Sequence, residues 1–571
     1  MSAPVSWLRR STPIVALAAA CASQPAPARV AADPAPLAAR TLRDHVAELF
    51  AKRYAPRDLK ARTIGWSLER ELARLDEVIA RPRATPEELR RAFRAFFRAP
   101  RDLHTSLELP PGRAVWLGLH LVSTDAGVRV AWIDPKLAPT LPLRVGDEVT
   151  AFDGRPIAEV HRRIAAADGY ASTPDFEREL ADWFLTLRSS TDLDDTPAPG
   201  ARARLVVRTH DPGAPARTVE LTWRDADADG PSERCPLWPK TKRSVLPPPE
   251  ELLWRAPDAA FYGAYAFSAA GRRYGFVRLH TYDVPPAEQP RAMREVDEAL
   301  SVFLERDVDA LVIDQRGNGG GNFLFAYVML SRLFERPLVP PRQRFLIDGD
   351  EVVGFGPRAA LAELGARLGG VRTDEEARAT MDAIPLFARF FGFGPRDRAT
   401  AQGAAAFFAF FASQPPGLTA PHFALVPEHV PERSRGPVFG KPVVMLIDGM
   451  SISAADYVPA ALKDNGRVTL FGTTTSGAGG DQRRVGRADA CKPGASELVR
   501  ACAPPEVIAA LETLGITAFN FTVTLGVRPG DRVIENVGVA PDVPYRVRAD
   551  DLTTGFSPMW RAVLDAAGAG R

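Results

Sequence analysis

The sequence predicts an α/β protein that carries helices toward its N-terminal end, and three observations support this class. Residues 40–100 contain three stretches with apolar residues at three-to-four spacing, which is typical of amphipathic helices. Residues 273–314 read as a strand, a helix and a buried strand, the βαβ unit of a parallel sheet. Residues 442–465 repeat the pattern, with an apolar strand that leads into a helix.

Length and composition bound the classes of function. A chain of 571 residues exceeds what one hydrophobic core usually serves, so we expect two to four domains. The 72 Lys and Arg nearly balance the 70 Asp and Glu, which gives no electrostatic case for nucleic acid as a partner. The four cysteines have no metal-ligand spacing. We therefore predict a folded, soluble protein without a metal ion or an organic cofactor.

The N-terminal 39 residues resemble a bacterial export signal. Arg9 and Arg10 precede a short apolar run, residues 14–20, which is followed by Cys21 and a segment rich in Pro and Ala. The run is too short to span a bilayer. Cleavage before Cys21 would leave that cysteine to be lipidated and would tether the protein to a membrane. We expect a periplasmic or lipid-anchored protein of the cell envelope, with a secreted protein or a plain disordered tail as the alternatives.

The remaining domain boundaries follow changes in composition. We predict an export signal and linker (1–39), an N-terminal helical bundle (40–110), a domain of short strands with two helices (111–224), a Pro-rich linker (225–255), the first part of an α/β core (256–330), a Phe- and Ala-rich helical insertion (331–435) and the second part of the core (436–571), with a smaller insertion at 483–515. The insertion at 331–435 can cover a site, form a dimer contact or simply extend the core. Cys491 and Cys502 flank a short loop and can close a local disulfide in an oxidising compartment.

The segment Leu-Arg-Val-Gly-Asp-Glu-Val at 143–149, followed by Phe-Asp-Gly at 152–154, resembles part of a PDZ domain. The resemblance implies a groove that adds a peptide as an extra strand and often captures a C-terminal carboxylate. The alternative is an ordinary small β domain that uses Gly-Asp and Asp-Gly as turns.

A glycine loop follows the second strand of the βαβ unit, with the sequence Gln-Arg-Gly-Asn-Gly-Gly-Gly-Asn at 315–322. Glycines let the backbone approach a ligand and turn N–H groups toward it. No Gly-Lys-Ser/Thr follows, and the dinucleotide fingerprint is not matched either. The loop therefore favours an oxyanion hole over a phosphate site.

Ser453 stands between the apolar strand 442–447 and the helical pattern that follows. A nucleophile suits this turn, because free N–H groups and the helix dipole stabilise negative charge nearby. The alternative is that Ser453 only caps the helix, which is common for serine.

His104, in Asp-Leu-His-Thr, and Glu535, beside a tight Gly turn, are two further candidates. Taken singly, a lone histidine is more often structural and a lone glutamate more often a surface charge.

In this order the motifs resemble the family of carboxy-terminal processing peptidases and the tricorn core protease. The resemblance implies a crotonase-like (ClpP/crotonase) core with an inserted PDZ domain. Ser-Ala-Ala-Asp at 453–456 stands where the family has Ser-Ala-x-Glu, which implies Ser453 as the nucleophile. The N–H of Ala454 and that of Gly319 or Gly320 would then form the oxyanion hole.

One departure from the family pattern selects the branch. Enzymes with a Ser-Lys dyad place a lysine after the second core strand, but residues 476–479 read Ser-Gly-Ala-Gly. The tricorn-like branch takes a histidine from the N-terminal region, so the resemblance implies His104 as the base and Glu535 as the acid that completes the relay. It implies a serine endopeptidase acting on exported or unfolded proteins and peptides. The alternatives are a non-catalytic lipoprotein that binds peptides or an apolar ligand, and an esterase.

Overall fold

The computed structural model describes most of the chain between residues 34 and 568, except residues 169–171, 194, 210–213, 227–234, 238–240, 243, 245–250, 337, 354, 385–395, 423–435 and 488–502. Cys21 and nearly all of the predicted export signal lie outside the described residues, as do Cys491 and Cys502. Within the described part of the chain, no helix is both long and apolar enough to cross a membrane.

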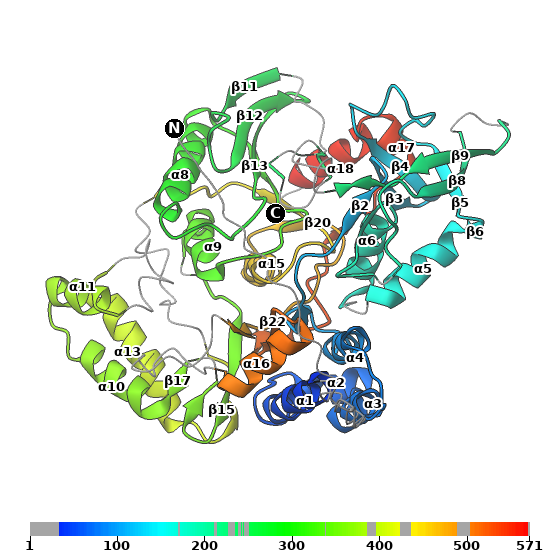
Figure 1. Cartoon of the computed structure of the whole chain (residues 1–571). Helices are drawn as coiled ribbons and strands as arrows, with labels where there is room; N and C mark the ends of the chain where they lie inside the picture. The colour runs from blue at the N-terminus through cyan, green and yellow to red at the C-terminus, as the bar shows by residue number, and fades with distance from the viewer. Residues whose placement is uncertain are drawn as a thin grey trace, which may run out of the picture. The chain divides into compact units, whose positions relative to one another are not determined.

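A seven-stranded sheet with the order β11-β12-β13-β14-β19-β20-β25 forms the centre of the molecule (Figure 1). The strands from β13 to β25 run parallel, which confirms the predicted α/β class. Asp314 at the end of β14 lies beside Leu446 of β19. The segments that follow these two strands therefore leave the sheet at the same edge, where open α/β sheets bind ligands. The bounds are β11 (Glu251–Arg255), β12 (Gly263–Ala269), β13 (Arg272–Arg278), β14 (Ala310–Asp314), β19 (Val443–Ile447), β20 (Thr469–Gly472) and β25 (Val543–Pro544).

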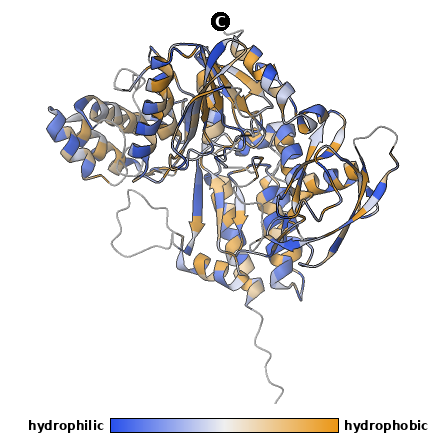
Figure 2. Ribbon diagram, turned by 90° about the horizontal axis from the view of Figure 1, so that it is seen from above, coloured by the Kyte–Doolittle hydropathy of each residue, from blue (hydrophilic) through white to orange (hydrophobic). Residues whose placement is uncertain are grey.

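Apolar side chains cover both faces of this sheet, because successive residues of a strand point to opposite sides. Leu311 and Ile313 pack in one core cluster with α8, α9 and α15, whereas Ala310 and Val312 pack in another with α18. Figure 2 shows hydrophobic residues along these strands and on the helices that face them. The helices are α8 (Gln289–Glu305), α9 (Phe323–Leu330) with the 3-10 turn η1 (Ser331–Leu333), α15 (Ala454–Asp464), α17 (Ala549–Thr553) and α18 (Ser557–Gly568).

Four helices at the N-terminal side pack against elements from the C-terminal quarter of the chain. They are α1 (Ala35–Lys52), α2 (Arg57–Ile64), α3 (Leu68–Ile79) and α4 (Pro86–Arg98). Their apolar faces share one cluster with α16 (Pro505–Leu514) and β22 (Ala518–Thr522), which lie beside them in Figure 1. The strand β1 (Ser106–Glu108) extends this contact, because it pairs with β22, which pairs in turn with β21 (Gln482–Gly486).

The region after β1 forms a six-stranded sheet with the order β3-β4-β5-β8-β9, in which β6 pairs with β5 and β3 lies at the edge. Two helices, α5 (Ile157–Asp168) and α6 (Pro174–Phe184), lie against it. The strands are β3 (Leu119–Thr124), β4 (Gly127–Ile133), β5 (Glu148–Phe152), β6 (Arg155–Pro156), β8 (Arg202–Arg208) and β9 (Arg217–Thr222), with a separate small sheet of β2 (Ala114–Trp116), β7 (Leu187–Ser189) and β10 (Arg224–Asp225).

The predicted helical insertion at 331–435 contains strands as well as helices, which corrects the prediction. Its strand β15 (Arg342–Asp348) alternates buried and less buried residues and pairs with β23 (Thr524–Arg528). That alternation is the period of a half-buried strand, and the Phe-rich stretches nearby obscured it. The other elements are α10 (Arg358–Gly369), α11 (Asp374–Asp382) and α13 (Arg398–Ser413), together with β16 (Glu351–Val352), β17 (Gly356–Pro357), β18 (Gly417–Leu418) and, further on, β24 (Arg532–Val533).

Candidate active site

Ser453 stands where β19 passes into α15, in a strained backbone conformation. Its φ of 60° and ψ of −116° fall in a region that non-glycine residues rarely adopt. Such strain persists only where the surroundings hold it, and it gathers at functional sites. Ser453 occupies the N-cap position of α15 and forms a capping box with Asp456, the third residue of the helix. The Ser453 side chain is half-buried.

Asp456, one turn into α15, fixes this strained turn. Its Oδ2 accepts a hydrogen bond from the Ser453 N–H at 2.9 Å. The carboxylate is fully buried, and burial raises its pKa while its hydrogen-bond donors oppose that shift. The further donors are Thr475 Oγ1 (2.5 Å), Ser476 Oγ (2.8 Å), Gly477 N–H (2.8 Å) and Ala478 N–H (3.1 Å). One buried carboxylate therefore ties the backbone of Ser453 to residues 475–478.

The glycine loop lies directly against Ser453. A Cβ added to Gly320 would stand 2.8 Å from the Cβ of Ser453 and 3.1 Å from the backbone nitrogen of Ala454. The two segments are joined where the Ile452 N–H donates to the Asn318 carbonyl at 2.9 Å. The sequence prediction that loop and serine share one site is consistent with this contact.

The two candidate glycines differ in their hydrogen bonds. The Gly320 N–H donates to Asn318 Oδ1 at 2.9 Å. In the described part of the chain, no group accepts a hydrogen bond from the N–H of Gly319 or from that of Ala454. An oxyanion needs donors that are not already engaged, so the geometry favours Gly319 and Ala454 over Gly320.

His104 lies in the loop between α4 and β1, where it is 8% exposed. The backbone N–H of His104 donates to Asp102 Oδ1 at 2.9 Å. Burial lowers the pKa of His104 and Lys60 adds to the effect, while Asp102 opposes it. The ring is therefore neutral near pH 7, the form that a general base requires.

Asp102 is itself held by several hydroxyl groups. It accepts hydrogen bonds from Tyr54 Oη (2.9 Å), Thr105 Oγ1 (3.0 Å) and Thr522 Oγ1 (2.8 Å). These donors fix the turn that presents His104. Nδ1 of His104 is buried without a hydrogen-bond partner, and within the described ranges no hydrogen bond joins the ring to Ser453 or to Glu535.

Glu535 forms an ion pair with Lys60 of α2, and both side chains are fully buried. Its other oxygen accepts the Gly479 N–H at 2.9 Å. Burial raises the pKa of Glu535 to about 7, although Lys60 works against this shift. The lysine also donates to Asn536 Oδ1 at 2.5 Å and to the Arg101 carbonyl at 3.2 Å. Lys60 thus influences Glu535 and His104 together, and within the described residues no hydrogen bond joins those two side chains.

The segment 475–479 connects the predicted site residues. Residues 475–478 hold Asp456 and through it Ser453, and Gly479 holds Glu535 and through it Lys60. Ala478, which stands at the lysine position of the Ser-Lys branch, is fully buried. The segment therefore serves as a structural junction and supplies no base.

Asp456 and Lys60 were missed as contributors by the sequence reasoning. An acid three residues after an N-cap serine is a capping signal that points to Asp456. For Lys60 no local signal exists, because its partner lies 475 positions away.

The edge of the PDZ-like sheet is covered by α6. Asp182 of this helix accepts hydrogen bonds from the Ser123 N–H of β3 (3.0 Å) and from its hydroxyl (2.6 Å). The same carboxylate lies 3.1 Å from Nε2 of His161 on α5. Trp183 stacks on His120 of β3 with ring centroids 3.7 Å apart. In this structure α6 therefore contacts both α5 and the edge strand β3.

The N-terminal end of α6 also rests on the junction segment. Ser172 Oγ donates to the Gly477 carbonyl at 3.2 Å, and Thr173 Oγ1 donates to the Thr475 carbonyl at 3.0 Å. The Thr474 N–H donates to Asp175 at 3.1 Å. A Cβ on Gly449 would lie 2.6 Å from the backbone of Asp175, so the two chains pass in close contact.

A search of the described residues finds no group of three or more His, Cys, Asp or Glu side chains able to hold a metal ion.

Comparison with known proteins assigns the two main parts of the chain. Residues 273–545 match the model of peptidase family S41, and residues 114–230 match that of a PDZ domain. A protein of Chlamydia pneumoniae is 24% identical over 89% of this chain and 86% of its own length. An uncharacterised protein of Chlamydia muridarum is 24% identical over 88% of both chains. Among solved structures, mature CPAF complexed with lactacystin superimposes with a TM-score of 0.73 at 24% identity, covering 92% of this chain and 97% of that one.

Proposed function

Since this chain is a serine-type peptidase of family S41 that carries a PDZ domain, we propose that Ser453 is its nucleophile and His104 its general base. The observation that carries the proposal is the strained Ser453 turn. It places the Ser453 side chain against the glycine loop, beside two N–H groups without an acceptor in the described chain, those of Gly319 and Ala454.

The mechanism follows from these groups. His104 takes the proton of the Ser453 hydroxyl as the oxygen attacks the peptide carbonyl, and the carbonyl oxygen becomes an oxyanion held by the Ala454 and Gly319 N–H groups. His104 then gives the proton to the leaving amine as the peptide bond breaks. Water hydrolyses the acyl-enzyme in the reverse sense, with His104 again as the base.

Asp102 and Glu535 take different parts in this proposal. Asp102 holds the His104 backbone, so it orients the base. Glu535 acts on His104 indirectly, through its ion pair with Lys60. By holding the positive charge of Lys60 in place, Glu535 completes the Ser-His-Glu relay. Direct contact between base and serine requires the loop at 101–105 to close when substrate binds, since catalytic hydrogen bonds often tighten only in the complex.

Several finer features belong to the same proposal. The core is crotonase-like, the four N-terminal helices act as a helical bundle, and the substrates are exported or unfolded proteins and peptides. A peptide C-terminus reaches the PDZ groove only if α6 moves away from β3. The N-terminal sequence supports export, with Cys21 as a membrane tether in a periplasmic or lipid-anchored form and secretion as the alternative.

The test compares the full chain with two variants, using a fluorophosphonate probe and an unfolded protein substrate. Ser453→Ala abolishes labelling and cleavage. His104→Ala slows both by about 10²- to 10⁴-fold, the usual contribution of a general base. Exposed Ser413→Ala, a serine on α13 outside the site, is the matched control and keeps full activity. Retained cleavage in Ser453→Ala would refute the assignment.

The second candidate is a non-catalytic lipoprotein that binds peptides or an apolar ligand. It is favoured by the absence, within the described residues, of a hydrogen bond between His104 and Ser453. Failure of the probe to label Ser453, together with peptide binding that survives His104→Ala, would support it.

A further inference from the structure

Asp456 holds its own N-cap residue in a conformation that helix capping does not require. In a capping box the third residue of a helix accepts the backbone N–H of the N-cap residue, and such boxes also begin α4, α11 and α17. Their N-cap residues, Thr85, Thr373 and Arg548, have extended backbones with φ of −76°, −123° and −101°. At α15, by contrast, Ser453 has a φ of 60°. Capping therefore does not account for the conformation of this turn.

The backbone groups around Asp456 call for an ionised carboxylate. Its Oδ1 accepts the N–H of Gly477 at 2.8 Å, and its Oδ2 accepts the N–H groups of Ser453 at 2.9 Å and Ala478 at 3.1 Å. A backbone N–H can donate a hydrogen bond but cannot accept one. An asparagine amide at this position, whichever way it is turned, would set its NH2 group against at least one of these N–H groups. The carboxylate can therefore not be replaced by its neutral isostere without loss.

Two hydroxyl groups complete the set of donors. Thr475 Oγ1 donates to Oδ1 at 2.5 Å, and Ser476 Oγ donates to Oδ2 at 2.8 Å. The Thr475 oxygen also accepts the Val539 N–H at 2.8 Å, which directs its own proton toward Asp456. Hydrogen bonds to a charged group are about twice as strong as neutral ones, and this carboxylate is fully buried. Five donors thus hold one negative charge beside Ser453.

A shift of Asp456 would move the reacting groups directly. The Ser453 carbonyl accepts the N–H groups of Asp456 at 2.7 Å and Tyr457 at 3.2 Å, so the strained residue is joined to the first turn of α15. Ala454, a proposed oxyanion donor, is the next residue in the chain. On the other side, an added Cβ on Gly320 would stand 2.8 Å from the Ser453 Cβ. The carboxylate and the glycine loop therefore hold the turn from two sides.

We propose that Asp456 is a positioning residue for the peptidase reaction, and that its buried carboxylate keeps the Ser453 oxygen and the Ala454 N–H in the geometry that the reaction needs. Backbone strain persists only where the surroundings over-determine it, and the hydrogen bonds to Asp456 supply that constraint. The inference rests on the proposed function, because it takes Ser453 as the nucleophile. Loss of a group that orients the nucleophile should lower kcat and leave KM unchanged.

The test uses the full chain, an unfolded protein labelled with fluorescein as the substrate, and the fluorophosphonate probe. Asp456→Asn should lower kcat and the rate of Ser453 labelling by about 10²-fold with KM unchanged, the usual effect of losing an oxyanion donor. Asp456→Glu keeps the negative charge, and glutamate is the residue that the family pattern has at this position. This conservative variant should therefore recover part of the lost kcat.

Asp551 of α17 offers a matched control. It is fully buried and is the third residue of a capping box. Its Oδ2 accepts the Arg548 N–H at 2.8 Å and its Oδ1 accepts the Met559 N–H at 2.9 Å. Asp551→Asn therefore creates the same conflict between donors, but behind an N-cap residue with an extended backbone. It should lower the Tm and leave kcat unchanged.

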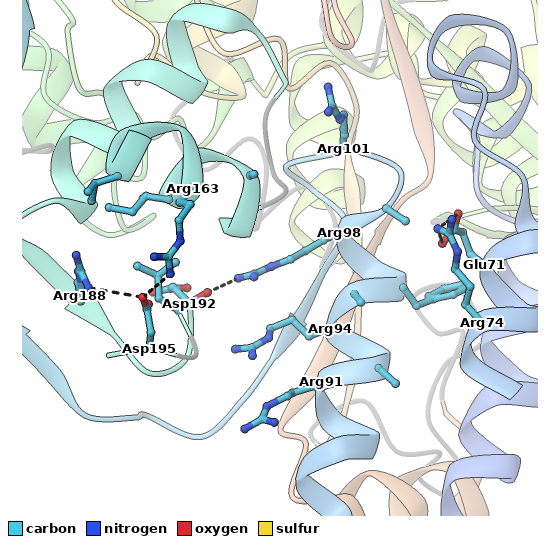
Figure 3. Close-up of a pocket in the computed structure, with 18 of the residues that line it drawn as sticks. Glu71, Arg74, Arg91, Arg94, Arg98, Arg101, Arg163, Arg188, Asp192 and Asp195 are labelled. Atoms are coloured by element: carbon cyan, nitrogen blue, oxygen red, sulfur yellow. Dashed lines mark hydrogen bonds and ion pairs between the residues drawn. The ribbon is translucent and has the colours of Figure 1, made fainter. Parts of the chain in front are cut away.

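A second control removes a buried charge that is paired with a cation. Figure 3 shows Glu71 beside Arg74 of α3, at a cavity between the N-terminal helices and the PDZ-like domain. Arg74 Nη1 donates to Glu71 Oε2 at 2.9 Å, and Glu71 is buried. Neither Ser453 nor the segment 475–478 lines this cavity. Glu71→Gln should therefore leave kcat and the labelling rate unchanged.

Stability and activity are measured on the same preparations, with the Tm taken from calorimetry. If Asp456→Asn lowers the Tm as Asp551→Asn does but keeps its kcat, the carboxylate is purely structural and the proposal is overturned. An equal fall of kcat in the two variants would also overturn it, because general destabilisation would then explain the loss. Equal kcat values for Asp456→Asn and Asp456→Glu would overturn it as well, since the charge would not matter.

Ser476→Ala keeps the proposal testable if Asp456→Asn does not fold. This variant removes one hydroxyl donor to Asp456 and leaves the charge in place. Its kcat should fall about fivefold, the equivalent of one net hydrogen bond, with KM unchanged. An unchanged kcat would overturn the proposal.

Ser453→Ala separates this inference from the proposed function. Full cleavage by Ser453→Ala would refute the assignment of the nucleophile itself. If Ser453→Ala is inactive while Asp456→Asn keeps the kcat of the wild type, the proposed function stands and the positioning role of Asp456 fails.

Discussion

At the scale of single residues, the space around Ser453 is set by one glycine. Gly320 has a φ of +90°, and an added Cβ would lie 2.6 Å from the Ile452 carbonyl oxygen and 2.8 Å from the Ser453 Cβ. All of these neighbours belong to the strained turn, so none of them can move without displacing the hydroxyl. The glycine loop and the serine therefore depend on each other for their shape.

Gly320→Ala should lower kcat by about 10²-fold or more, because it displaces Ser453 and the proposed oxyanion donors, the N–H groups of Gly319 and Ala454. The measurement is single-turnover cleavage together with the rate of fluorophosphonate labelling. Gly271→Ala is the matched control, since Gly271 also has a positive φ but no atom within 4 Å of an added Cβ. Normal labelling of Gly320→Ala would contradict the close contact.

The buried pair Lys60 and Glu535 gives a second prediction at this scale. Lys60→Met should destabilise the fold by about 3–5 kcal/mol, because it leaves the Glu535 carboxylate buried without its partner. The double variant Lys60→Met, Glu535→Gln should recover part of that loss. The measurement is the shift of the first thermal transition in calorimetry, and an unchanged transition in the single variant would show that the pair contributes little.

At the scale of elements, α6 links the PDZ-like sheet to the junction segment 475–479. It carries Glu179, whose pKa burial and the nearby Asp448 raise to about 8 from an ordinary value of 4.5. The carboxyl also accepts a hydrogen bond from Thr473 Oγ1 at 2.9 Å. Burial and Asp448 favour the protonated form of Glu179, whereas the Thr473 hydrogen bond favours the ionised form, so the contribution of Glu179 to the docking of α6 depends on pH.

Replacing Glu179 by Gln should therefore change how stability varies with pH. The raised pKa in the folded state means that the stabilisation by Glu179 is complete below about pH 4.5 and is lost as the pH rises through about 8. The Tm of the wild type minus that of Glu179→Gln should fall across this window. Asp182→Asn, on the same helix, serves as the control for a general loosening of α6. A constant difference between pH 5 and 9 would refute the linkage.

The elements also show how far sequence reasoning reaches. Strands β14 and β19 and helix α15 follow from short-range spacing, because each buries a regular pattern of its own residues. The backbone conformation at Ser453 is harder to predict from the sequence. It depends on Asp456, whose carboxylate is held by hydrogen bonds from residues about twenty positions away. The ion pair between Lys60 and Glu535 could not be predicted from the sequence. The family resemblance pairs Glu535 with His104, and Lys60 and Glu535 lie far apart in the chain. The covering of β3 by α6 likewise depends on tertiary contacts.

At the scale of the whole molecule, the N-terminal helices complete the core of the C-terminal quarter. Phe97 packs 5.2 Å from Phe519, and Phe50 packs 6.2 Å from Phe521, measured between ring centroids. These rings are fully buried in one cluster. The helices at 35–98 are therefore an internal part of the folded enzyme.

A chain that begins at residue 101 should consequently fail to fold. Loss of α1 to α4 would expose Phe519 and Phe521 to water, and aggregation or strong binding of a hydrophobic dye is the expected readout. Co-expression of residues 35–100 as a separate chain should restore soluble protein. Soluble, active protein from the shortened chain alone would contradict this account.

The ion pair between Lys60 and Glu535 also has a consequence in time. The partners are separated by 475 positions. Because ribosomes add about 5–20 residues each second, Glu535 is synthesised roughly half a minute to a minute and a half after Lys60. Until then the loop that carries His104 lacks both the buried lysine contact and the strand β22 beneath it. If His104 is the base, as proposed, we expect a growing chain to gain activity only when it is nearly complete.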